Sequence, residues 1–193
     1  MIKKDVSLDE LNKISKIDIK NPKKYFKELE EFSKPEKITI KNSDEEIIIN
    51  LVEGDAKKGL THIWLRHVMG YESDKTATTF FPMGQTVNGK KLPKIIGDAN
   101  ELKKIIKEAI EDEDIKKEFY EDNSKVTFEY TYVNENGKTI SIYFVFMKVK
   151  DGSGYYLKTM YPEGGDGVYR YVNNYGWLKC VGKKGDKWIF EKE

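Results

Sequence analysis

Both histidines of the chain lie in one short stretch, GLTHIWLRH, which covers residues 59–67. Histidine exchanges a proton near neutral pH, so His62 and His67 are candidates for a general acid and a general base. On a helix, His62 and Arg66 share a face because they are four residues apart. His67 lies about 140° around the axis from His62, so a regular helix does not aim both rings at one small target. A structural role for each histidine is the alternative.

The sequence argues against a bound metal or cofactor. The histidine spacing is not the four-residue spacing of a zinc-binding helix, and there is no third histidine and only one cysteine, Cys180. No Walker-type or dinucleotide-binding glycine pattern is present. We therefore expect no metal and no cofactor, and we read Cys180 as an idle thiol rather than a nucleophile.

The stretch YYLKTMYP, residues 155–162, predicts a strand that carries hydroxyl groups near its end. Because side chains alternate along a strand, we expect Tyr155, Leu157, Thr159 and Tyr161 on one face. The Thr159 and Tyr161 hydroxyls could hold a phosphate oxygen or a leaving group. The ordinary preference of threonine and tyrosine for strands is the alternative explanation.

Charge is distributed unevenly, although the net charge is only +1. Residues 57–94 contain seven basic and two acidic side chains, whereas residues 98–122 contain five basic and ten acidic ones. The basic block includes both histidines and the loop SDKTATTFFP, in which Lys75 and Thr79 could bind an anion. The choice between a phosphate-binding surface and a simply solvated one stays open.

The hydrophobic pattern predicts the elements that must position these residues. Apolar residues at helical spacing indicate helices within residues 21–34, 59–69 and 98–120, with Asn21 and Asp98 as N-caps. Alternating patterns indicate strands on either side of the Asn-Ser-Asp turn at residues 42–44, and again from Lys125 onward, where an Asn-Gly pair predicts a hairpin. Two or three short strands with glycine-rich turns are expected in the tail.

These elements indicate an α+β fold, with N-terminal helices followed by a mainly antiparallel, twisted β-sheet. We expect residues 1–55, a helical segment and a hairpin, to pack on a main domain formed by residues 56–193. There is no secretory signal and no run of the roughly 18 apolar residues that a membrane helix needs. A soluble, cytoplasmic protein with no membrane partner is expected, and delivery into a target cell is compatible with the sequence.

Three of these pieces together resemble a known superfamily. The helix KGLTHIWLRH, the segment TTFFP and the strand YYLKTMYP follow one another in an order that resembles the barnase, EndoU, colicin E5/D and RelE nucleases, the BECR superfamily. They are similar to its phage- and toxin-associated members, which have a "GL.HI..RH" helix and a terminal "T.YP" strand. The resemblance spans residues 58–162 and leaves residues 1–35 and the tail unmatched.

The resemblance implies a BECR-like fold and a metal-independent ribonuclease. By position, His62 is the leading acid–base candidate, His67 is the second histidine or its supporter, and Thr159 and Tyr161 lie at the sheet end of the cleft. Contacts with phosphate are expected from Lys58, Arg66, Lys75 and Thr79.

Such an enzyme would cleave RNA by attack of the 2′-OH and leave a 2′,3′-cyclic phosphate. The near-neutral net charge favours a specific RNA such as a tRNA loop over nonspecific binding. A cognate immunity or antitoxin protein is the expected protein partner. The alternative is a non-catalytic, phage- or conflict-associated protein-binding module on the same fold.

Overall fold

A computed structural model describes residues 27–71, 77–114, 117–119 and 123–193. The fold is of the α+β class, and the expected antiparallel sheet is present. The described part of the first predicted helix is α2, Lys27–Phe32, while its expected N-cap, Asn21, lies outside the described residues. None of the helices in the described ranges is long and apolar enough to cross a membrane.

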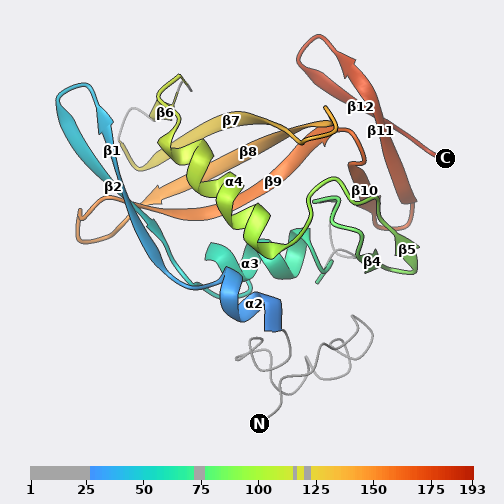
Figure 1. The fold of residues 1–193 in the computed structure, drawn as a ribbon, viewed down its shortest axis with the longest axis horizontal. Coiled ribbons are helices and arrows are strands. Elements are labelled where there is room, and N and C mark those ends of the chain that lie inside the picture. Colours follow the sequence, from blue (N-terminus) through green and yellow to red (C-terminus); the bar gives the residue numbers. More distant parts are fainter. Residues whose placement is uncertain (1–26, 72–76, 115–116, 120–122) are drawn as a thin grey trace.

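A six-stranded sheet in the order β1-β2-β9-β8-β7-β6 forms the centre of the molecule (Figure 1). Its strands are β1 (Glu36–Asn42), β2 (Glu45–Leu51), β6 (Glu118–Phe119), β7 (Lys125–Val133), β8 (Thr139–Lys148) and β9 (Tyr155–Gly165). The predicted Asn-Gly turn joins β7 to β8, with Gly137 at a φ of 77°. As its apolar density predicts, β8 is central, between β7 and β9.

The N-terminal hairpin is part of this sheet rather than a unit packed against it. Strand β2 pairs with β9 in parallel through Ile49 and Asn50, and the Asn50 side-chain amide donates a hydrogen bond to the Tyr155 carbonyl. All the other strand pairings among the described residues are antiparallel. The predicted division at residue 55 therefore cuts across a continuous sheet.

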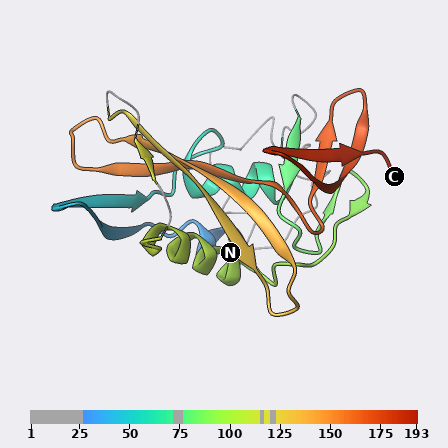
Figure 2. The same cartoon turned by 90° about the horizontal axis from the view of Figure 1, so that it is seen from above.

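Helix α4, Ala99–Glu111, covers one face of the sheet (Figures 1 and 2). Its predicted cap is confirmed, because the Asp98 carboxylate accepts a hydrogen bond from the Glu101 N–H at 2.9 Å. The helix ends at Glu111, and part of the stretch predicted as its continuation forms β6 instead. The apolar side of α4 meets a buried row of stacked rings formed by Phe128, Phe144 and Phe146.

Helix α3, Gly59–His67, packs along β9. Leu60, Ile63 and Trp64 are almost completely buried, and the Trp64 ring lies 5.2 Å from that of Phe32 on α2. Burying each such side chain contributes roughly 1.5–3 kcal/mol, which fixes the helix in place. Strand β2 pairs with β9 only at Tyr155 and Tyr156. The polar side of α3 is consequently held beside the later part of β9, where β2 no longer pairs with it.

A second sheet, in the order β12-β11-β10-β3, lies beside the first. It combines β3 (Thr78–Phe80) with three strands of the tail, where two or three were expected: β10 (Tyr169–Val172), β11 (Gly176–Lys184) and β12 (Lys187–Glu191). Strands β4 (Thr86–Val87) and β5 (Lys90–Lys91) form a small hairpin between β3 and α4. The pairing of β3 with β10 is the link that brings residue 170 opposite residue 79.

Candidate functional site

A cavity of about 410 Å³ opens where α3, β9 and the second sheet meet. Most of the candidates named from the sequence line it, although they come from three separate parts of the chain. Its walls are formed by His62, Arg66, His67, Ala77, Thr78, Thr79, Thr159, Tyr161 and Arg170.

The hydrogen bonds of His62 define which ring nitrogen carries the proton. Nδ1 lies 2.9 Å from the carbonyl oxygen of Ala56, which can only accept, so Nδ1 carries the hydrogen. Nε2 of the neutral ring is then an acceptor, and it lies 3.1 Å from the Thr159 hydroxyl, which donates to it. His62 therefore presents an unprotonated nitrogen towards the cavity.

The surroundings of His62 keep it in this neutral form. Burial lowers the pKa of His62 below its ordinary value, the Ala56 hydrogen bond and Asp55 oppose that shift, and the charges of Arg66 and Lys158 add to it. A neutral imidazole with an unprotonated nitrogen is the form that a general base requires.

An irregularity in β9 aims Thr159 and Tyr161 at the cavity. Phe146 pairs with Leu157 but its neighbour Val145 pairs with Thr159, so one extra residue stands in β9. The adjacent β8 residues Val145 and Phe146 point to opposite faces of the sheet. Their partners Thr159 and Leu157 therefore also point to opposite faces. The expectation that they share a face is thus wrong, because the bulge reverses the alternation. Thr159 and Tyr161 do share a face, as expected, since their partners Val145 and Tyr143 are two residues apart.

His67 occupies a different environment from His62. It is buried, and its Nδ1 donates a hydrogen bond to the carbonyl oxygen of Thr79 at 3.0 Å. Burial lowers the pKa of His67 to about 3, against the opposing effect of that hydrogen bond. Its ring lies 5.7 Å from those of both His62 and Tyr161, measured between centroids. The geometry favours the supporting role that the resemblance allowed for this histidine.

Two arginines supply positive charge to the cavity. Arg66 donates a hydrogen bond to the Thr78 hydroxyl at 3.0 Å, which turns its guanidinium towards β3. Arg170 comes from β10 and stacks over the Phe190 ring at 4.0 Å. Sequence reasoning missed Arg170, because its stretch YRYV has no motif and only the pairing of β10 with β3 places it here.

The structure places the remaining residues predicted to contact phosphate in different positions. Thr79 lines the cavity, although its carbonyl is occupied by His67. Lys58 is absent from the lining, and its ammonium group lies 5.8 Å from the centre of the Tyr156 ring. Lys75 lies outside the described residues. The structure therefore brings Arg66 and Thr79 together and separates them from Lys58.

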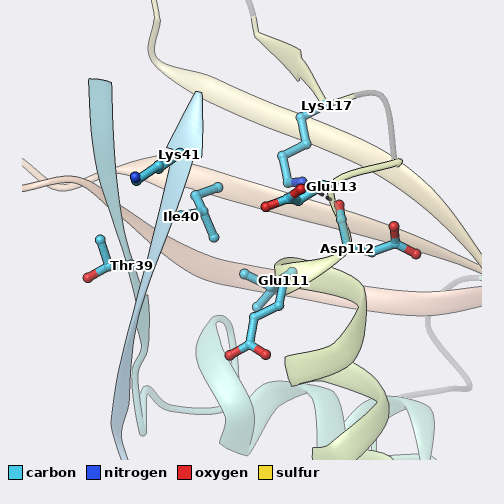
Figure 3. A pocket seen from close by; sticks show the side chains of 8 residues that line it. Thr39, Ile40, Lys41, Glu111, Asp112, Glu113 and Lys117 are labelled. Carbon is cyan, nitrogen blue, oxygen red and sulfur yellow. Dashed lines mark hydrogen bonds between the residues drawn. The ribbon is translucent and has the colours of Figure 1, made fainter. Parts of the chain in front are cut away.

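A larger cavity of about 590 Å³ lies between β1 and the end of α4 (Figure 3). Its charged side chains are Glu111, Asp112, Glu113 and Lys117 on one side, with Lys41 across from them on β1. Among the described residues its lining has no histidine and no arginine, so they offer neither a base poised near neutral pH nor a guanidinium for an anion. The smaller cavity is chemically the better equipped site.

Within the described ranges, no cluster of three or more histidine, cysteine, aspartate or glutamate side chains is arranged to hold a metal ion. Comparison with known proteins adds no further guide to this site: no family model matches the chain, and neither a curated protein nor a solved structure shows significant similarity to it.

Proposed function

We propose that the cavity at His62 is the active site of a metal-independent endoribonuclease with a BECR-like fold. The observation that supports this most strongly is the orientation of His62, whose Nε2 lone pair meets a hydroxyl group at 3.1 Å beside two arginines. RNA carries a hydroxyl of the same kind, the 2′-OH, next to each phosphate. Substrate binding would replace the Thr159 hydroxyl on Nε2 by this 2′-OH.

The cavity contains groups suited to each step of such a cleavage. His62 takes the proton of the 2′-OH, and the oxygen attacks the adjacent phosphorus to form the 2′,3′-cyclic phosphate. Arg66 and Arg170 stabilise the negative charge that develops on the phosphate oxygens. The proton for the departing 5′-oxygen comes from Tyr161, whose pKa is raised by burial and by Glu163, so its phenol stays protonated at neutral pH.

His67 and Thr159 position this machinery in our proposal. His67 packs its ring against Tyr161 and His62 and ties α3 to β3 through Thr79. Thr159 holds His62 until substrate arrives. Replacing Thr159 by valine should therefore reduce the rate less than replacing His62. If Thr159→Val abolishes cleavage and Thr159→Ser retains it, Thr159 would instead be the nucleophile.

The test is incubation of the purified protein with tRNA and total RNA at neutral pH in the presence of EDTA. Cleavage fragments should end in a 2′,3′-cyclic phosphate, and an oligonucleotide with a single 2′-deoxy sugar at the cleaved position should stay intact. His62→Ala should lower the rate about 10²–10⁴-fold, the usual contribution of a proton-transfer group. Lys41→Ala, in the other cavity, is the matched control and should cleave like the wild type.

RNA that stays intact under these conditions would count against the ribonuclease. A tRNA target, which the near-neutral net charge favours, and a cognate immunity or antitoxin protein, which the resemblance implies, belong to the same proposal. If function in the cell survives replacement of His62 by alanine, the alternative of a non-catalytic, protein-binding module is favoured.

A further inference from the structure

The sheet face next to the cavity carries a row of aromatic rings that extends beyond Tyr161, the only one of them that the proposed cleavage chemistry uses. Tyr143 on β8 pairs with Tyr161 on β9, and their ring centres are 5.6 Å apart. The Tyr161 ring is in turn 5.7 Å from His67 at the cavity wall. The row therefore begins in the cavity and runs outward over the central strands.

This row lies on the face of the sheet opposite α4. Tyr143 stands between Ile142 and Phe144, which are completely buried, so its side chain points the other way. It is partly exposed, and Glu129, its partner on β7, is exposed. A flat molecule can consequently reach the Tyr143 ring from solvent.

Acceptor groups stand beside the row, Glu129 opposite Tyr143 on β7 and Glu163 two residues after Tyr161 on β9. A second irregularity in β9, where Ser141 pairs with Gly164 but Ile142 pairs with Pro162, leaves Glu163 as the extra residue. Its carboxyl group accepts a hydrogen bond from the Ser141 hydroxyl at 3.2 Å and is also hydrogen-bonded to Glu129. Burial, followed by the charge of Glu129, raises the pKa of Glu163, while Lys183 opposes the shift.

The groups on this face correspond to the parts of a nucleotide. Arginines suited to a phosphate lie in the cavity, aromatic rings suited to a base come next, and carboxyl groups that can accept from the amino group of a base lie beside those rings. A base that is already paired in a helix has no face free to lie on Tyr143, whereas an unpaired one does.

We propose that Tyr143 and Tyr161 form a stacking subsite for an unpaired nucleobase next to the phosphate held by Arg66 and Arg170, with Glu129 and Glu163 facing the edge of that base. This assignment rests on the proposed function for the identity of the phosphate, and it makes single-stranded RNA the substrate class. Tyr143 acts here in binding and takes no part in the chemistry.

The test measures binding separately from cleavage. The His62→Ala protein is titrated into a fluorescent single-stranded RNA oligonucleotide, its base-paired form and the same strand as DNA, with anisotropy as the readout. We expect the single strands, RNA and DNA alike, to bind more tightly than the duplex. Adding Tyr143→Ala should weaken binding of the single strands about 5- to 150-fold, the range for loss of one stacked base. Adding Tyr143→Phe, which keeps the ring, should change little.

Tyr175 provides the matched control, since it is an exposed tyrosine outside the row. Tyr175→Ala should leave the dissociation constant unchanged. Equal effects of Tyr143→Ala and Tyr175→Ala, no preference for single strands, or no binding of any oligonucleotide would each overturn the subsite. Binding that depends on Tyr143 in a protein whose wild type cleaves no RNA would support the subsite and refute the ribonuclease. If the Tyr143→Ala protein cleaves RNA with an unchanged KM, the ribonuclease would be supported and the subsite refuted.

Discussion

The buried histidine should make the stability of this protein strongly dependent on pH. His67 has a pKa of about 3 in the folded protein and an ordinary value of 6.5 when the chain is unfolded. Between these two values the unfolded chain binds a proton that the folded protein excludes. The contribution of His67 to the free energy of unfolding is therefore present in full above pH 6.5 and is lost progressively as the pH falls towards 3.

The size of the effect follows from the same two pKa values. At pH 4.5 the unfolded state is two pH units below its own pKa, whereas folded His67 stays almost entirely neutral. One unit corresponds to about 1.4 kcal/mol, so moving from pH 7 to pH 4.5 should remove roughly 2–3 kcal/mol of stability through this residue alone. That is a large share of the ~5–15 kcal/mol that stabilises a typical domain.

Urea unfolding of the wild type and of His67→Asn at both pH values isolates this contribution. Asparagine keeps an N–H donor that can serve the Thr79 carbonyl, but it does not titrate. The variant starts from a lower stability and should lose roughly 2–3 kcal/mol less than the wild type on acidification. Effects of His62 and of the carboxylates are common to both proteins and cancel in the comparison.

Equal pH dependence in the two proteins would refute the reasoning. An NMR titration of the wild type gives a second readout that needs no folded variant. The His67 ring protons should keep the chemical shifts of the neutral form down to the pH at which the protein unfolds. A titration midpoint near 6.5 for His67 in the folded protein would also contradict the structure.

Three further predictions concern the charge near the site, one contact between the sheets, and one helix. Lys158→Gln removes a charge that lowers the pKa of His62. The His62 titration midpoint measured by NMR, and the acidic limb of any pH–rate profile, should therefore move to higher pH. A shift to lower pH would contradict this effect of Lys158 on His62. Gly164→Ala would place a methyl group 2.3 Å from the Trp188 ring and should cost about 1–3 kcal/mol in urea unfolding, an effect that Trp188→Leu should partly relieve if that contact is the cause. Asp98→Ala should destabilise the protein by about 1 kcal/mol by thermal or urea unfolding, whereas Asp98→Ser should retain most of the capping effect.

The elements that the sequence predicts best are those with local signals. The turn at Asn136 and Gly137 and the cap at Asp98 depend on residues only a few positions apart, and both are confirmed. The apolar side of α3 is likewise set by helical spacing, so Ile63 and Trp64 are buried as expected. Periodicity and turn chemistry act over a few residues, which is the range that a single sequence displays directly.

The features that escaped prediction depend on contacts between distant segments. The extra residue between Leu157 and Thr159 reverses the alternation of β9 without any glycine to mark it. Arg170 reaches the cavity only through the pairing of β10 with β3, which no spacing in the sequence encodes. Candidate residues could therefore be named by chemical type, but the set that meets in one cavity depended on the register of strands far apart in the chain.

The wide separation of these segments has a consequence for the growing chain. His62 lies 97 positions before Thr159, to which it is hydrogen-bonded, and Arg170 follows later still. Synthesis proceeds from the N-terminus, so α3 and α4 emerge long before the strands that complete the cavity. A chain in which β9 and β10 have not yet been made can display His62 but has no Thr159 or Arg170 to place beside it. The cavity is thus incomplete until β9 and β10 have both been made and paired.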